Sequence, residues 1–133
     1  MGRQAAVKIL LDTHTVVWMT ESDPRLGRGI ARLARAFAVG EAAISDITFL
    51  EIAICVKKGR IILEEPVEDY LRKLSQYYTV LPISPQIAVE AYSLDMHGDP
   101  FDRVIVATAR CHRMQLATCD GAIVDSGLVK IIW

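Results

Sequence analysis

Short apolar runs alternate along the chain with segments whose apolar residues recur every three or four positions. The runs are typical of buried strands, and the recurring positions predict amphipathic helices. The expected strands cover residues 7–11, 42–44, 79–83, 116–118 and 128–133. The expected helices cover residues 16–19, 30–37 with an end near Gly40, 48–58, 67–74, 87–94 and 101–114.

Strands that are separated by helices predict a mostly parallel sheet with helices on both faces, which is a three-layer α/β/α sandwich of the α/β class. A chain of 133 residues can bury the core of such a domain without disulfides. No repeat or linker divides the sequence. Residues 1–133 are therefore expected to form a single domain.

Charged residues interrupt each apolar run well before the roughly 18 residues that a membrane span needs, although 52% of the chain is hydrophobic. Residues 1–8 carry basic side chains but lack the apolar segment of a secretory signal. The protein is therefore expected to be cytoplasmic. Cys55, Cys111 and Cys119 are an odd number without framework spacing, and they are expected to be reduced core residues.

Four acidic residues stand beside apolar segments where neutral side chains are usual: Asp12, Glu51, Asp102 and Asp120. Asp12 and Asp120 come at or just after the carboxyl ends of expected strands, and parallel strands bring those ends to one rim, where such sheets bind ligands. Glu51 lies early in the helix after the second strand. Asp102 begins the helix that follows Gly98. All four carboxylates are expected to converge on this rim.

Converging carboxylates repel one another, and a proton or a cation must compensate. Oxygen ligands suit Mg²⁺ or Mn²⁺, which keep several waters and use one or two protein carboxylates each. Such an ion can acidify a water and stabilise the leaving oxygen of a phosphodiester, so the expected reaction is phosphodiester hydrolysis. Apart from these four, twelve acidic residues face fifteen basic ones, a balance compatible with a polyanionic substrate.

Five segments of the sequence carry a resemblance to a known family. They read, in chain order, ILLDTHTVVW, ITFLEIAICVKKGRI, DPFDRVIVATA, LATCD and the final IIW. Each segment alone is weak, because an apolar run ending in Asp-Thr occurs in many α/β proteins. Together, in this order and spacing, they resemble a PIN-domain ribonuclease, and the VapC toxin branch in particular, over almost the whole chain.

The resemblance implies a PIN-like fold with an acidic cluster that binds Mg²⁺ or Mn²⁺ and cleaves RNA. The residues assigned to this cluster are Asp12, Glu51, Asp102 and Asp120. Asp99 is a possible auxiliary acid, and Thr118 matches a hydroxyl residue that can hydrogen-bond within the site. Arg103 is a candidate for phosphate contact, although it could equally pair with Asp99.

The resemblance also implies binding partners. A small antitoxin protein of the VapB kind would mask the site, often with a basic residue among the acids. Any DNA binding by the complex would come from that antitoxin. A homodimer is expected from the family as well.

Each acid also has an ordinary structural explanation. Asp12, Asp102 and Asp120 could cap helices, and Glu51 could pair with a nearby lysine. Two other functions stay open on sequence grounds. One is a catalytically silent PIN-like module that only binds protein or RNA. The other is a haloacid-dehalogenase-like phosphatase, because DTHT echoes the DxDxT nucleophile motif, although His14 replaces the second acid.

Arg28, Arg32 and Arg35 form a stripe on the helix expected at 30–37. The stripe could contact RNA phosphates, but charges on one side of an amphipathic helix are usually a solvated face. Trp18 and Trp133 fit core or dimer packing better than base stacking.

Overall fold

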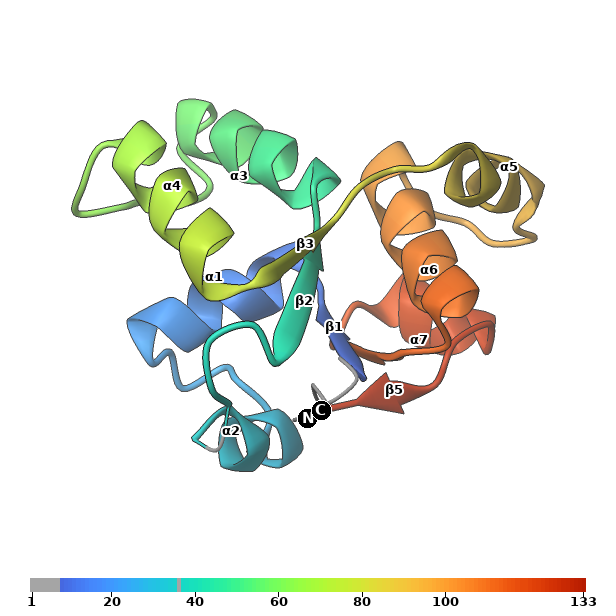
Figure 1. Cartoon of the computed structure of the whole chain (residues 1–133), viewed down its shortest axis with the longest axis horizontal. Helices are drawn as coiled ribbons and strands as arrows, with labels where there is room; N and C mark the ends of the chain where they lie inside the picture. Colours follow the sequence, from blue (N-terminus) through green and yellow to red (C-terminus); the bar gives the residue numbers. More distant parts are fainter. Residues whose placement is uncertain (1–7, 36) are drawn as a thin grey trace, which may run out of the picture.

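The computed structural model describes residues 8–35 and 37–133, which form a parallel sheet flanked by helices (Figure 1). The strands are β1 (Ile9–Leu11), β2 (Ala42–Ser45), β3 (Thr79–Leu81), β4 (Gln115–Ala117) and β5 (Ile131–Ile132). The helices are α1 (Thr13–Glu21), α2 (Arg28–Ala34), α3 (Ile47–Lys57), α4 (Val67–Tyr77), α5 (Pro85–Ser93), α6 (Pro100–His112) and α7 (Gly121–Ser126). Residues 1–7 lie outside the described residues. They include the first residue of the expected strand 7–11 and most of the segment 1–8, for which no secretory signal was expected.

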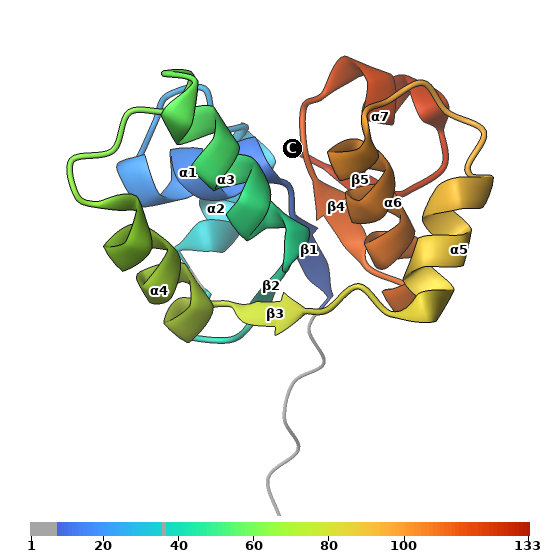
Figure 2. The same ribbon diagram turned by 90° about the horizontal axis from the view of Figure 1, so that it is seen from above.

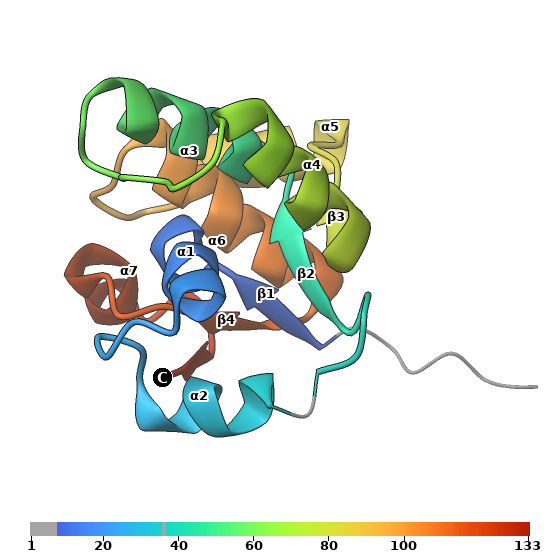
Figure 3. The same cartoon turned by 90° about the vertical axis from the view of Figure 1, so that its left-hand side faces the viewer.

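The sheet has the strand order β3-β2-β1-β4-β5, and every neighbouring pair is parallel. Helices α1 to α4 gather on one side of it and α5 to α7 on the other (Figures 1 and 2). Figure 3 looks onto the side that α1 to α4 cover. The predicted three-layer α/β/α sandwich is therefore confirmed.

The two faces of the sheet bury two separate hydrophobic clusters, because successive strand side chains point to opposite faces. On β1, Leu11 packs with the cluster under α1 to α4, and Leu10 packs with the cluster under α5 to α7. Ala117 and Leu116 divide in the same way on β4. Helices cover both faces of the sheet, so the side chains of β1 and β4 are apolar on both sides and the strands appear as continuous apolar runs in the sequence.

Several expected elements differ from the observed ones at their ends. The helix expected at 30–37 is α2, which ends at Ala34, and the last expected strand shrinks to β5. Helix α7 was not predicted, since it has only six residues and one buried side chain, Ile123. Its signals are Asp120 at the N-cap and Gly127 at the C-cap, where a φ of 67° favours glycine.

The chain ends in a close contact with the start of α2. A Cβ atom on Gly27 would lie 2.5 Å from the carbonyl carbon of Trp133, and one on Gly29 would lie 2.6 Å from its oxygen. The indole of Trp133 meets that of Trp18 edge-on at 5.8 Å. Both tryptophans therefore pack within the fold, as their expected role in packing required.

Two further expectations concern cysteines and membranes. Cys55 is buried, but Cys111 is only partly buried and Cys119 is exposed, so the prediction of three core cysteines was wrong for Cys119. The cause is its place in the loop between β4 and α7, beyond the end of the buried strand. Among the helices in the described ranges, none is both long and apolar enough to cross a membrane.

Candidate functional site

The candidate site lies where the order of the strands reverses. From β1 the chain moves outward to β2 and β3, and it later returns to place β4 on the other side of β1. The carboxyl ends of β1 and β4 therefore border a crevice between helices that leave in opposite directions, which is where open parallel sheets bind ligands. Asp12 follows β1 and Asp120 follows β4 closely, so both acids lie at this crevice.

Asp12 is buried and is held by three groups. Its Oδ1 atom accepts the backbone N–H of Thr15 at 2.8 Å, which caps α1. The Thr15 hydroxyl lies 2.6 Å from Oδ1 and 2.7 Å from the carbonyl oxygen of Ala117, so it ties α1 to β4. The Thr118 hydroxyl donates to Oδ2 and accepts the N–H of Asp120 at 3.1 Å. Thr118 thus links two of the acids by hydrogen bonds.

Glu51 lies half-buried in the second turn of α3 and points back to the start of α1. Its carboxylate accepts a hydrogen bond from the hydroxyl of Thr13. Thr13 is itself buried, and the hydroxyl of Thr48 lies 3.4 Å from it. The bond to Thr13 replaces the pairing with a lysine that the sequence allowed, and it fixes Glu51 beside Asp12.

Two more acids are placed by helix N-termini. Asp120 caps α7, where Oδ1 accepts the N–H of Ile123 at 3.1 Å. Asp99 caps α6, where Oδ1 accepts the N–H of Asp102 at 2.8 Å. The sequence suggested that Asp102 could be the cap of this helix, and this was wrong because Asp102 is the third residue of α6 and its own N–H is the capped one. Its side chain is free for another role.

Burial and mutual repulsion act strongly on Asp102. Burial, followed by the charges of Asp99, Asp120, Glu51 and Asp12, raises the pKa of Asp102 to about 7. All five acids therefore act on one electrostatic environment. A carboxyl group with this pKa is half protonated near neutral pH unless a cation is bound.

Glu51 is shifted in the same direction. Burial raises its pKa, the hydrogen bond from Thr13 opposes that rise, and the charges of Asp99 and Asp12 add to it. His14, which lies exposed on α1, opposes the rise as well. The site thus places two carboxyl groups where added positive charge would stabilise them.

The donor set fits a hard divalent cation. All of its atoms are oxygens, which Mg²⁺ and Mn²⁺ prefer. Burial and the neighbouring carboxylates raise the pKa of Asp102, and a bound cation would oppose both effects. Within residues 8–35 and 37–133, no three His, Cys, Asp or Glu side chains stand close enough to hold one ion together. An ion that keeps several waters needs only one or two direct carboxylates. The other acids would then contact the waters bound to the ion.

Arg103 has a structural role that the sequence did not reveal. Its guanidinium donates to the carbonyl oxygens of Ala91, Tyr92, Leu94 and Met96 at 2.7 to 3.1 Å. These bonds tie the start of α6 to the end of α5 and the loop after it. The sequence offered phosphate contact or a pair with Asp99, and neither agrees with a guanidinium that is occupied by four carbonyls.

Replacing Arg103 with alanine is expected to lower the free energy of unfolding by about 1–3 kcal/mol, because partly buried carbonyl oxygens lose their donors. Arg103→Lys is expected to lose less, since an ammonium can satisfy some of them. Denaturant unfolding would measure both changes. Arg72→Ala is the matched control, because its side chain is 63% exposed on α4 and its loss should change stability by less than about 0.5 kcal/mol. Equal stability of Arg103→Ala and the wild type would refute the clamp.

Sequence reasoning missed the part that Thr13 and Thr15 play. Their signal was present, because Thr13 and Thr15 follow the strand-ending Asp12 within three residues. Only the packing of α1 against α3 and β4 shows that Thr13 meets Glu51 and that Thr15 meets Ala117.

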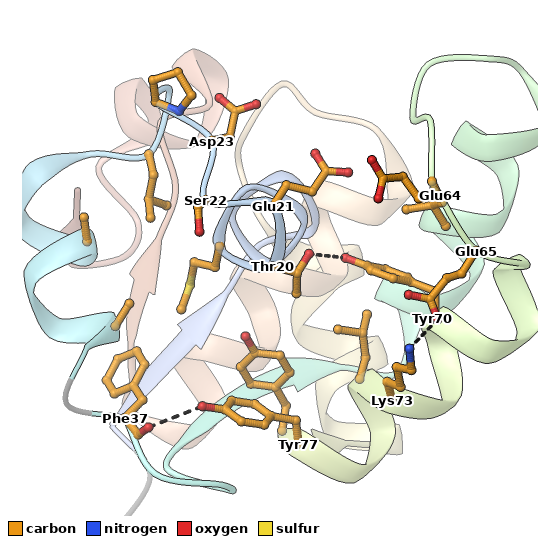
Figure 4. A pocket seen from close by; sticks show the side chains of 18 of the residues that line it. Thr20, Glu21, Ser22, Asp23, Phe37, Glu64, Glu65, Tyr70, Lys73 and Tyr77 are labelled. Atoms are coloured by element: carbon orange, nitrogen blue, oxygen red, sulfur yellow. Dashed lines mark hydrogen bonds and ion pairs between the residues drawn. The ribbon is translucent and has the colours of Figure 1, made fainter.

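A hollow lies away from the acids, at the carboxyl end of α1 (Figure 4). It has a volume of about 1210 Å³ and is bordered by α1, α2, α4 and the loop before α4. Aromatic residues line it, and Tyr70 bonds to Thr20 at 2.7 Å. Glu21, Asp23 and Glu64 stand along one edge. The hollow is thus apolar inside and acidic at its rim.

The chain is similar in sequence to known proteins. The model of the family described as PIN domain matches residues 9–125. Ribonuclease VapC22 from Mycobacterium tuberculosis is 32% identical over 114 residues, which cover 84% of this chain and 86% of that protein.

Solved structures have a similar fold. A toxin-antitoxin complex from Klebsiella pneumoniae matches with a TM-score of 0.65 and 24% identity, over 94% of this chain and 96% of that chain. FitAcB from Neisseria gonorrhoeae matches with a TM-score of 0.68 and 20% identity, over 94% and 96% of the two chains.

Proposed function

The chain belongs to the PIN-domain family, in its VapC ribonuclease branch, and we propose from this that it is a metal-dependent endoribonuclease that acts as the toxin of a toxin–antitoxin pair. The observation that carries the proposal is the common environment of the acids at the strand reversal. Burial, followed by the charges of four other carboxylates, raises the pKa of Asp102 to about 7. Carboxylates gathered in this way attract a cation, and a cation bound there would in turn attract the negatively charged phosphodiester of a nucleic acid.

Four acids are proposed to hold the ion, directly or through water: Asp12, Glu51, Asp102 and Asp120. The proposed ion is Mg²⁺ or Mn²⁺, which would supply the charge that activates a water and stabilises the leaving oxygen. Asp99 adds negative charge and holds the first turn of α6 in place. Thr118 orients Asp12 through its hydroxyl, while Thr13 orients Glu51.

We also propose a small antitoxin of the VapB kind as the partner, with DNA binding supplied by that antitoxin. Such an assembly is seen in a solved structure with a similar fold, DNA-bound VapBC from Salmonella typhimurium. The hollow in Figure 4 offers a suitable surface, since its aromatic floor and acidic rim fit an apolar segment with basic side chains. A single cytoplasmic domain that forms a homodimer completes the proposal.

The decisive experiment is cleavage of a mixed panel of single-stranded and structured RNAs by protein freed of any antitoxin. We expect cuts in the presence of Mg²⁺ or Mn²⁺ and none in EDTA, as mass spectrometry or sequencing of the products would show. p-Nitrophenyl phosphate serves as the control substrate and should remain intact, since a phosphatase would hydrolyse it. RNA binding without cleavage in either metal would instead support the silent module.

A further inference from the structure

A second concave surface lies at the opposite edge of the sheet from the acids. It has a volume of about 730 Å³ and is bordered by the amino ends of β1 and β4, the end of α6 and the segment before β5. We call this surface the basic groove, because its lining includes the basic residues Lys8, Arg110, His112, Arg113 and Lys130. No acidic residue from the described part of the chain is among its lining residues, whereas the hollow in Figure 4 has four.

Helix α6 alone does not explain this charge. Basic residues in the last turn of a helix are favoured by the helix dipole, which accounts for Arg110, His112 and Arg113. Arg110 also has structural partners, because it pairs with Glu90 at 2.7 Å and donates to the carbonyl oxygen of Leu128 at 2.6 Å. Lys8 and Lys130 belong to no helix, and both are exposed. Their positive charge has no such structural explanation.

The sheet itself sets the spacing of these two lysines. The carbonyl oxygen of Lys8 accepts the N–H of Gln115 at 2.9 Å, and that of Lys130 accepts the N–H of Leu116 at 2.8 Å. Lys8 and Lys130 therefore flank the start of β4, two strand spacings or about 10 Å apart. Arg113, at the turn that leads into β4, lies between them along the same edge. Three positive charges thus line one rim.

We propose that the basic groove binds phosphates of the substrate RNA away from the bond that is cleaved. This inference rests on the proposed nuclease function. The acids repel RNA, and the formal net charge of the chain is −1, so attraction of a polyanion needs a separate positive surface. Lys8 and Asp12 stand four residues apart along β1, about 13 Å. This straight line runs through the sheet, so only an RNA long enough to pass around the covering helices can contact both sites.

The groove is suited to phosphates rather than to bases. No phenylalanine, tyrosine or tryptophan from the described part of the chain lines it, so the large aromatic rings on which single-stranded bases usually stack are missing. Contacts to phosphate alone are independent of sequence and weaken with added salt. The groove thus adds affinity for long RNA and leaves the choice of cleavage point to the acidic site.

The test compares two double variants that remove the same charge. Lys8→Gln/Lys130→Gln removes the two lysine charges of the basic groove, and Arg60→Gln/Arg72→Gln removes two exposed arginine charges outside it. Binding of a fluorescent 30-nucleotide RNA is measured in EDTA, so that cleavage plays no part. We expect the lysine variant to bind about tenfold more weakly, with a slope of log affinity against log salt smaller by about 1.4. The arginine variant should bind like the wild type.

Cleavage then separates this proposal from the nuclease proposal. With metal present, the lysine variant should show a raised KM for the long RNA, an unchanged kcat, and unchanged cleavage of a six-nucleotide RNA. If the lysine variant binds RNA as tightly as the wild type and still cleaves it with metal, the proposal for the basic groove is wrong and the nuclease proposal is supported. If RNA binding depends on the two lysines but the protein never cleaves RNA, the nuclease proposal is wrong and RNA binding by the basic groove is supported. Capture of poly-glutamate in preference to RNA would overturn the groove in favour of an acidic protein.

Discussion

The substitution Asp12→Asn is expected to reduce metal-dependent RNA cleavage by at least about 100-fold, since even residues that merely support metal ligands typically contribute 10-fold to 100-fold. The fold should survive. Asparagine keeps the oxygen that caps α1 and is as good an N-cap as aspartate. Its amide can donate to the Thr118 hydroxyl in place of the bond that Thr118 now donates to Asp12. The free energy of unfolding should therefore change by no more than about 1 kcal/mol.

Asp125→Asn is the matched control for this experiment. Asp125 is an exposed aspartate on α7, only five residues beyond Asp120, and it is not among the charges that raise the pKa of Asp102. The control should cleave RNA at the wild-type rate. Cleavage rates of both variants, with circular dichroism to verify folding, make the comparison. Full activity of a folded Asp12→Asn protein would contradict the assignment of Asp12 to the site.

The second large effect concerns pH. With a pKa of about 7, Asp102 carries a proton over much of the range below neutral pH, and a divalent ion must displace that proton to bind. The apparent metal affinity should therefore fall about tenfold for each pH unit below 7 and level off above it. Glu51, whose pKa is also raised, acts in the same direction and can only steepen the fall.

The same shift predicts an opposite trend for the metal-free protein. A carboxyl group whose pKa is raised on folding stabilises the folded state at low pH, and that contribution disappears as pH rises from about 4 through 7. The melting temperature without metal should thus decrease from pH 5 to pH 8 at constant ionic strength, while the gain on adding Mn²⁺ should increase. In Asp102→Asn both trends should flatten. Calorimetric titration and thermal unfolding would measure them, and a metal affinity that does not vary between pH 6 and 8 would rule out the coupling.

Much of the fold could be predicted, and so could the place of Asp12 and Asp120 at the ends of β1 and β4, because both depend on the order of the strands along the chain. Apolar runs marked the strands, and in a parallel sheet a residue that ends a strand must lie on one rim. That reasoning placed Asp12 and Asp120 together before any contact was known. The basic groove could not be found by the same logic, because Lys8 and Lys130 fall inside the expected strands 7–11 and 128–133. Only the observed strands β1 and β5 begin just after these lysines.

Contacts across the fold could not be predicted in this way. The partners of Arg103 are backbone carbonyls, which have no signature in the sequence, so its charge suggested phosphate instead. Thr13 meets Glu51 only because α1 packs on α3 at a particular depth. The exposure of Cys119 depends on where β4 ends, and a difference of one residue moves a side chain from the core to solvent.

Three of the carboxylates also serve as helix caps. Asp12, Asp99 and Asp120 each give one oxygen to the backbone N–H three residues ahead, at Thr15, Asp102 and Ile123. An ion that draws on the other oxygen of such a carboxylate changes the charge felt by that amide proton. In a nuclear magnetic resonance spectrum, these three backbone signals would report how each carboxylate responds to an ion, residue by residue and without any RNA. Fraying of a first helical turn would appear in the same signals, because cap and ligand are one group.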